Sequence, residues 1–276
     1  MRAQLSGNRI KEWMMSWDPK TYLAFGAERT RPASDLLARV PLEAPKRVVD
    51  LGCGPGNSTA LLRARWPDAE ITGIDSSLEM LRDARASGVA ARFIEADITT
   101  WTPDDPYDVV FSNAVLQWLG DHESLIPRLF SFVRPGGVLA FQMPRNYDEV
   151  CQVLVREAVA DPRWSAQLES VRDWWNGLVP ERYYDLLAPK AEMVDFWETR
   201  YFHVLEGPDA VFRWMMGTSL RPFAAALESP QKEEFLEHYR GLLGAAYPPR
   251  GDGKTIHRFL RLFIVARRSF DSITKL

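Results

Sequence analysis

Between Arg47 and Met143 the sequence alternates short apolar runs with stretches of helical periodicity. Most of the apolar runs are continuous, which is typical of strands buried on both faces of a sheet. The stretches between them begin near Ser or Thr, residues that favour helix N-caps. This alternation predicts an α/β fold with a mostly parallel sheet and right-handed crossovers. The predicted strands are Arg47–Leu51, Ile71–Asp75, Arg92–Glu95, Asp108–Phe111 and Val138–Met143, and the predicted helices are Ser58–Trp66, Ser77–Ala86 and Ser124–Val133.

The sequence after Met143 has a different character. Asn146–Val159 is amphipathic, and the segment from Arg163 to Leu187 is rich in Trp, Tyr and Arg. We expect a mostly helical insertion there. The elements predicted beyond it are strands at Met193–Val204 and Phe259–Arg267 and helices at Asp209–Met216 and Gln231–Ala246.

The composition excludes several classes of protein. Of 276 residues 46% are hydrophobic, and the net charge is −3. The chain is therefore too hydrophobic to be disordered and lacks the basic excess of a general nucleic-acid binder. No apolar run approaches the roughly 18–20 residues that a membrane span needs, so no membrane partner is expected. Two cysteines, Cys53 and Cys151, cannot form a disulfide scaffold, and no signal peptide is recognisable, which predicts a cytoplasmic protein.

A glycine-rich segment directly follows the first predicted strand. Gly52, Gly54 and Gly56 alternate with other residues, and Asp50 precedes them. A dinucleotide-binding loop needs Gly-x-Gly-x-x-Gly, and both possible registers fail because Asn57 or Thr59 takes the third position. The segment resembles the first motif of class I S-adenosylmethionine-dependent methyltransferases. The resemblance implies that Asp50, Gly52 and Gly54 lie at the cofactor S-adenosyl-L-methionine.

The ends of the next three predicted strands continue this resemblance. A carboxylate at the end of the second strand, Asp75, can accept both hydroxyls of a ribose, although an acid there can also cap the following helix. After the third strand, the family's pattern implies that Asp97 accepts from the adenine amino group, and a solvated loop aspartate is the alternative. The further cofactor-binding residues that the resemblance implies are Ser76, Ile98, Asn113 and Trp118.

Several further segments resemble the trans-aconitate 2-methyltransferase family. They are Ser16–Phe25, Glu28–Pro32, Leu36–Leu42, Asp50–Leu62, Gly217–Pro222 and Arg261–Arg268. The resemblance implies a Rossmann-like fold with a seven-stranded sheet flanked by helices, and a helical cap over the active site. It also implies esterification of one carboxylate of trans-aconitate, with S-adenosyl-L-homocysteine as the second product. The expected organisation is an extension at 1–14, a segment covering the cofactor at 15–45, the cofactor-binding core at 46–145, the helical cap at 146–190, and at 191–276 the completion of the sheet with further cap helices.

Such a reaction needs little from the protein beyond positioning. A carboxylate is already ionised at neutral pH, so no general base is required, and we expect no catalytic residue in that sense and no metal. The carboxylates that are not methylated need cationic partners, and 27 of the 34 basic residues are arginine. The candidate acceptor-binding residues are Trp17, Tyr22, Arg29, Arg31, Arg145, Tyr183, Tyr184, Arg221 and Arg261. Of the four histidines, only His203 falls on a predicted strand near the cap, where a structural role is favoured.

Alternatives remain open. A methyltransferase could act on another small acid or another small molecule, or the chain could hold the cofactor without turnover. A nicotinamide-dependent dehydrogenase is disfavoured by the failed glycine register. Nucleic-acid methylation is disfavoured by the net charge and by Ser112-Asn113-Ala114-Val115 after the fourth strand, which is unlike an Asn-Pro-Pro-Tyr segment.

Overall fold

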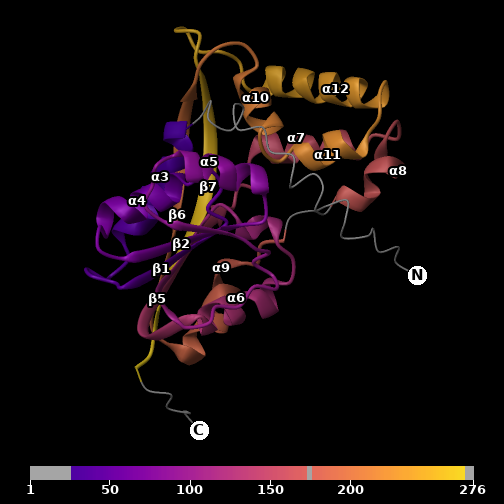
Figure 1. The fold of residues 1–276 in the computed structure, drawn as a ribbon. Helices are drawn as coiled ribbons and strands as arrows, with labels where there is room; N and C mark the ends of the chain where they lie inside the picture. Colours follow the sequence, from indigo (N-terminus) through magenta and orange to yellow (C-terminus); the bar gives the residue numbers. More distant parts are fainter. Residues whose placement is uncertain (1–25, 173–175, 271–276) are drawn as a thin grey trace. The chain divides into compact units, whose positions relative to one another are not determined.

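The computed structural model describes residues 26–172 and 176–270, and within them the chain forms a seven-stranded sheet of order β3-β2-β1-β4-β5-β7-β6 (Figure 1). The pairs β1–β2, β1–β4, β2–β3 and β4–β5 are parallel. The strands are β1 (Arg47–Leu51), β2 (Glu70–Asp75), β3 (Arg92–Glu95), β4 (Tyr107–Asn113), β5 (Val133–Pro144), β6 (Ala191–Leu205) and β7 (Thr255–Arg268). The expected α/β class and mostly parallel sheet are confirmed.

Contacts within the chain group the residues into two compact units. The first, which we call the sheet unit, contains the described residues within 26–144, 176–199 and 262–270. The second, the helical unit, contains 145–172 and 200–261. The boundary passes through the strands β6 and β7, so each of these strands contributes residues to both units.

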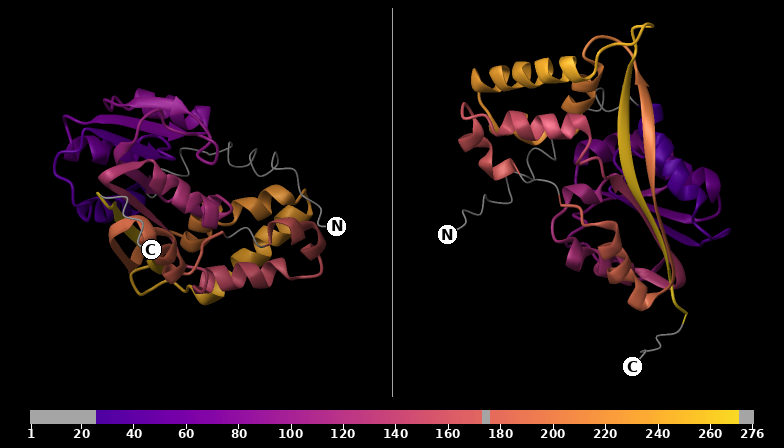
Figure 2. Two further views of the ribbon diagram at one scale, coloured as in Figure 1. Left: turned by 90° about the horizontal axis from the view of Figure 1, so that it is seen from below. Right: turned by 180° about the vertical axis from the view of Figure 1, so that it is seen from behind.

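Helices cover both faces of the sheet in the sheet unit (Figures 1 and 2). On one side lie α3 (Gly26–Ala38), α4 (Asn57–Arg65) and α5 (Leu78–Ala86), and on the other lie α6 (His122–Ser131) and α9 (Pro180–Leu187). The Ser77 hydroxyl caps α5 by accepting from the Met80 N–H at 3.3 Å. Short 3₁₀ turns are η1 (Leu116–Trp118) and η3 (Ala188–Lys190).

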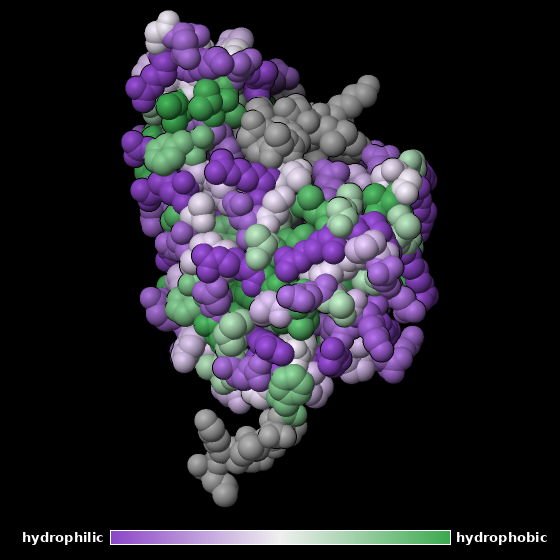
Figure 3. Space-filling view, turned by 90° about the vertical axis from the view of Figure 1, so that its left-hand side faces the viewer, coloured by the Kyte–Doolittle hydropathy of each residue, from purple (hydrophilic) through white to green (hydrophobic). Residues whose placement is uncertain are grey.

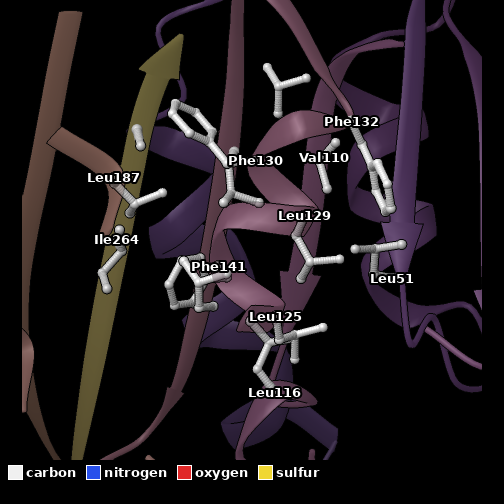
Figure 4. Packing of buried hydrophobic residues seen from close by; sticks show 14 of the residues in the cluster. Leu51, Val110, Leu116, Leu125, Leu129, Phe130, Phe132, Phe141, Leu187 and Ile264 are labelled. Carbon is white, nitrogen blue, oxygen red and sulfur yellow. The ribbon is translucent and has the colours of Figure 1, made fainter. Parts of the chain in front are cut away.

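The main core cluster lies between the sheet and the helices α6 and α9 (Figure 4). Leu125 and Leu129 stand one turn apart on α6 and pack with Leu51 of β1. Val48, the neighbour of Val49 on β1, is equally buried but faces the opposite side, because successive side chains of a strand alternate. Burial on both faces explains the continuous apolar pattern of this strand.

The segment Arg134–Gly137 differs from its sequence-based interpretation. Its Pro and Gly residues predict a turn between a helix and a strand, but the structure includes them in β5. The pairing changes register there, since Tyr107 pairs with Val133 while Val109 already pairs with Val138. Asp108, opposite the irregularity, accepts from the backbone N–H groups of Lys46 and Arg47 at 2.7 Å each.

The helical unit is built from α7 (Val150–Val159), α8 (Ser165–Leu168), η2 (Glu169–Val171), α10 (Ala210–Met216), α11 (Arg221–Ala226) and α12 (Gln231–Ala246). The helices α7 and α12 contact each other, and the Tyr239 hydroxyl donates to the Cys151 carbonyl at 2.9 Å. Trp164 packs edge-on against Phe235. Helices therefore occupy the segments where helical patterns predict them.

One face of the molecule is predominantly polar. On the face drawn in Figure 3, hydrophilic residues are most frequent and apolar residues occur between them in small groups. Within the described residues, none of the helices combines the length and the apolar character that crossing a membrane requires.

Candidate active site

Polar residues gather at the carboxyl ends of four neighbouring parallel strands. Asp50 lies within β1, Asp75 ends β2, Asp97 follows β3, and Asn113 ends β4. Because β1 pairs in parallel with both β2 and β4, the ends of these strands meet at one edge of the sheet. Open α/β sheets bind ligands at this edge. We call the four residues and the glycine loop the carboxyl edge.

The glycine loop after β1 adopts a conformation that its glycines allow. Gly52, Gly54 and Gly56 have φ values of 70°, 53° and 92°. A Cβ on Gly52 would lie 2.4 Å from Val115 Cγ2, so packing excludes a side chain there. A Cβ on Gly54 would meet nothing within 4 Å among the described residues, so these leave the backbone of Gly54 open to close approach by a ligand. Between them, the Cys53 thiol is buried.

Asp50 is fully buried beneath this loop. Its Oδ2 accepts from the hydroxyls of Ser58 and Thr59, both at 2.7 Å, which joins the strand to the start of α4. Its Oδ1 has no hydrogen-bond partner within the described part of the chain. Burial raises the pKa of Asp50 to about 6. The carboxylate therefore supports the loop and keeps an acceptor oxygen for a further donor.

Asp75 is held by backbone groups on both of its oxygens. Oδ2 accepts from the Gly54 N–H and Oδ1 from the Ser77 N–H, each at 2.9 Å. Burial raises the pKa of Asp75, while these hydrogen bonds oppose that change. Each carboxylate oxygen can accept more than one hydrogen bond, so Asp75 can orient the loop and still receive two hydroxyl donors. Its neighbour Ser76 is exposed.

The third strand ends in a compact turn. Asp97 Oδ1 accepts from the backbone N–H of Thr99 at 2.9 Å and from its hydroxyl at 2.6 Å. Asp97 is half-buried, and the next residue, Ile98, is buried. The Ile98 carbonyl accepts from the Arg128 guanidinium at 2.8 Å, which fixes this turn against α6.

The segment after β4 depends on a histidine that sequence reasoning missed. Half-buried Asn113 accepts from the Gln142 amide, and Trp118 closes the 3₁₀ turn η1. His122 Nε2 lies 2.8 Å from the Leu116 carbonyl, and its Nδ1 lies 2.6 Å from the Tyr183 hydroxyl. Burial lowers the pKa of His122, so its neutral ring donates to one partner and accepts from the other.

Three predicted acceptor-binding arginines lie in the helical unit. Arg261 is 4% exposed, and its guanidinium carbon lies 4.6 Å from the centroid of the Phe259 ring. Arg145 is half-buried and its backbone N–H donates to the Leu260 carbonyl at 2.9 Å. Arg221 begins α11 and is half-buried. A buried guanidinium such as that of Arg261 is the kind of group that holds a carboxylate out of water.

The remaining candidates are distributed differently. Tyr183 is buried in the sheet unit with its hydroxyl bonded to His122, and its hydroxyl also accepts from the Leu178 N–H at 3.0 Å. Tyr184 is exposed beside Phe196, and Arg31 is exposed on α3. Arg29 belongs to α3, but its side chain lies outside the described residues, as do Trp17 and Tyr22.

A groove of about 650 Å³ occurs at the other end of the sheet. Its lining includes Arg47, Glu70 and Arg92, which begin β1, β2 and β3. Ligands of such sheets bind at the carboxyl ends instead. The groove therefore contributes nothing to the carboxyl edge.

Comparison with known proteins adds independent information. A family profile described as a methyltransferase domain matches residues 25–198. A trans-aconitate 2-methyltransferase of Azoarcus sp. (strain BH72) is 49% identical over 92% of this chain and 100% of its own length. A protein of the same name from Methylobacterium radiotolerans is 48% identical over 93% of this chain and 100% of its own. Among solved structures, the YcgJ protein of Bacillus subtilis shares the fold, with a TM-score of 0.55 and 11% identity, covering 87% of this chain and 98% of that one.

Proposed function

Because this chain belongs to the trans-aconitate 2-methyltransferase family, we propose that it transfers a methyl group from S-adenosyl-L-methionine to one carboxylate of trans-aconitate. The product is a monomethyl ester. The observation that carries the proposal is the combination, in one chain, of an intact carboxyl edge with a buried arginine, Arg261.

The carboxyl edge fits the cofactor. Within the described residues, the backbone at Gly54 is open and Oδ1 of Asp50 has no partner, so they offer room and an acceptor for its amino-acid portion. We assign the ribose hydroxyls to Asp75 and the adenine amino group to Asp97, with Ser76, Ile98, Asn113 and Trp118 beside them. When bound, S-adenosyl-L-methionine supplies a methyl group activated by its sulfonium. The chain itself supplies orientation.

The acceptor requires recognition rather than activation. Its carboxylates have reference pKa values of about 4, so they are ionised at neutral pH and need no base. We propose that Arg145, Arg221 and Arg261 bind the carboxylates that are not methylated, and that Arg29, Arg31, Trp17 and Tyr22 contribute to the same recognition. Tyr183 and Tyr184 are left out of this proposal, because the Tyr183 hydroxyl is bonded to His122 in the core and Tyr184 is exposed beside Phe196. Holding the reacting oxygen in line with the methyl group and stripping its water lowers the barrier by up to ~7–11 kcal/mol.

The test combines an acceptor panel with matched arginine variants. Methyl-labelled cofactor is incubated with di- and tricarboxylic acids, and we expect base-labile label on trans-aconitate. Arg261→Ala and Arg221→Ala should raise the KM for trans-aconitate about 100-fold, which corresponds to the ~2.7 kcal/mol of a charge-assisted hydrogen-bonded pair. Arg258→Ala is the control, because Arg258 lies three residues from Arg261 but is exposed.

The panel also decides between the alternatives. Label on a different acid would identify another small-molecule methyltransferase, and binding of S-adenosyl-L-homocysteine with no label on any acid would identify a non-catalytic module. Unchanged acceptor kinetics in both arginine variants would contradict the assignment of the arginines. We also propose a cytoplasmic location, which the two free, buried cysteines support because thiols stay reduced there.

A further inference from the structure

One face of the strands β6 and β7 in the helical unit carries buried polar side chains. On β7, His257 and Arg261 are buried while Arg258 between them is exposed, as the alternation of a strand requires. On β6, His203 is buried between the exposed residues Phe202 and Val204. We call His203, His257 and Arg261 the β6–β7 polar face.

Aromatic rings surround this face. The Trp214 ring of α10 stacks on His203 with centroids 4.7 Å apart, and its centroid lies 5.6 Å from that of His257. The rings of Phe259 and Tyr247 lie 5.6 Å and 6.0 Å from His257. The surroundings are therefore largely apolar, and a hydrogen bond made here is stronger than one made in water.

His257 is the unexplained member of the group. It is completely buried, and neither ring nitrogen has a hydrogen-bond partner among the residues that the structure describes. Burial, with a smaller effect of His203, lowers the pKa of His257 to about 3, so its ring is neutral at pH 7 and carries one N–H donor. An unmatched donor in an apolar site costs free energy of folding.

Asn146 repeats the pattern on a neighbouring segment. It is 2% exposed, and its Nδ2 also has no partner within the described ranges. The hydrogen bond from the Arg145 N–H to the Leu260 carbonyl holds its chain segment against the part of β7 that carries Arg261. Two donors that lack a partner among the described residues and a buried guanidinium thus belong to adjoining segments of one unit.

Poor packing throughout the unit does not explain these donors, because the buried side chains of Gln152 and Tyr239 in the helical unit are satisfied. The Gln152 amide donates to the Ser219 hydroxyl at 2.7 Å, and the Tyr239 hydroxyl donates to a backbone carbonyl. Native proteins leave few buried donors unpaired, and those that remain call for an explanation such as a ligand.

We propose that His257 and Asn146, together with Arg261, form a carboxylate-binding pocket that recognises a carboxylate of the acceptor other than the methylated one. The inference rests on the function proposed above. A carboxylate offers two acceptor oxygens, which match the imidazole N–H, the amide N–H and the guanidinium. The pocket makes these residues determinants of specificity for a tricarboxylate over a dicarboxylate.

The decisive variant is His257→Phe, which keeps a ring of similar size and removes both nitrogens. We expect the KM for trans-aconitate to rise at least 30-fold, with kcat within threefold and an unchanged Kd for S-adenosyl-L-homocysteine. The melting temperature should stay level or rise, because an unmatched polar group is removed from an apolar site. A purely structural histidine would lower the melting temperature and leave the KM alone. His257→Gln, which retains an amide N–H, should recover part of the affinity.

Shortened acceptors identify the carboxylate concerned. Glutaconate and mesaconate each lack one of the carboxylates of trans-aconitate. If His257 and Asn146 bind one carboxylate, His257→Phe and Asn146→Leu will leave the KM unchanged for the shortened acid that lacks this carboxylate. The same variants will raise the KM for the other shortened acid. His238→Phe, a substitution of a half-buried histidine on α12, is the control and should change neither KM.

The outcomes separate this inference from the proposed function. Wild-type protein that transfers no label to trans-aconitate would contradict the function itself. Wild-type protein that methylates trans-aconitate, together with unchanged KM values in both His257→Phe and Asn146→Leu, would overturn the pocket alone.

Discussion

The carboxyl edge and the β6–β7 polar face both hold polar groups out of water, but they satisfy them differently. At the carboxyl edge the acids accept mainly from groups close by in sequence: Asp97 from Thr99, and Asp75 from Ser77 as well as from the Gly54 N–H of the neighbouring loop. On the polar face, His257 has aromatic neighbours from separate elements, and its ring nitrogens have no hydrogen-bond partner in the part of the chain that the structure describes. The first region is organised by its own short motifs, whereas the second is organised by tertiary packing.

This difference matches the proposed roles, in which the carboxyl edge binds the cofactor and the β6–β7 polar face binds the acceptor. Many methyltransferases share one cofactor, so short motifs at the strand ends of the common fold can bind it. An acceptor particular to one family needs residues assembled from distant parts of the chain. The following predictions test whether the two regions act separately.

Asp75→Ala should have the largest effect on the carboxyl edge. It removes both proposed ribose contacts and the acceptor of the Gly54 N–H. We expect the Kd of S-adenosyl-L-homocysteine, measured by calorimetric titration, to rise about 100-fold, the equivalent of ~2.7 kcal/mol. The preference for trans-aconitate over glutaconate should persist at saturating cofactor. Unchanged cofactor affinity would remove the ribose assignment, and an altered acceptor preference would break the separation of the two regions.

Gly52→Ala and Gly54→Ala form a matched pair within the loop. Both positions have positive φ, which costs an alanine ~1–2 kcal/mol. At Gly52 the new methyl group also meets Val115, so its free energy of unfolding should fall by a further ~1–3 kcal/mol in urea denaturation. Gly54→Ala has no such clash and should mainly weaken cofactor binding. Val115→Ala should partly rescue Gly52→Ala; equal losses of stability in the two glycine variants would show that the Val115 contact is unimportant.

The smallest effect concerns the protonation of Asp50. Its pKa in the free protein is about 6, so the carboxylate is ionised at pH 7 and becomes protonated as the pH falls below 6. If the ionised form receives a donor from the cofactor, the Kd of S-adenosyl-L-homocysteine should rise between pH 7 and 5, by at most about tenfold per unit below pH 6. Asp50→Asn should flatten this dependence. A wild-type Kd independent of pH would show that Asp50 only supports the loop.

The sheet unit could be predicted closely because its signals are local. The strand Arg47–Leu51 was predicted with its observed bounds because β-branched residues mark it and a glycine loop ends it. In the helical unit, the helix Gln231–Ala246 was predicted equally well. The strand β5 begins at Val133, five residues before its predicted start at Val138. Val133 pairs with Tyr107, so the strand includes the Pro and Gly residues that predicted a turn.

Residues of the candidate site could be proposed from the sequence only where a short motif contains them. His122 matters through Tyr183, a partner 61 residues away that no local pattern connects to it. His257 lies two residues before the predicted strand Phe259–Arg267, although the structure includes it in β7, and only its burial with no partner among the described residues distinguishes it. Contacts between remote segments decide such roles, and a single sequence does not display them.

The position of Cys53 has a consequence for the chemistry of the loop itself. The thiol stands between two glycines at the proposed cofactor site, yet burial raises its pKa far above the ordinary value, and the charges of Asp50 and Asp75 add to this. The thiolate is the form that reacts with oxidants and alkylating reagents. Because this thiol stays protonated, we expect it to react slowly with oxidants and alkylating reagents even though it lies in the glycine loop.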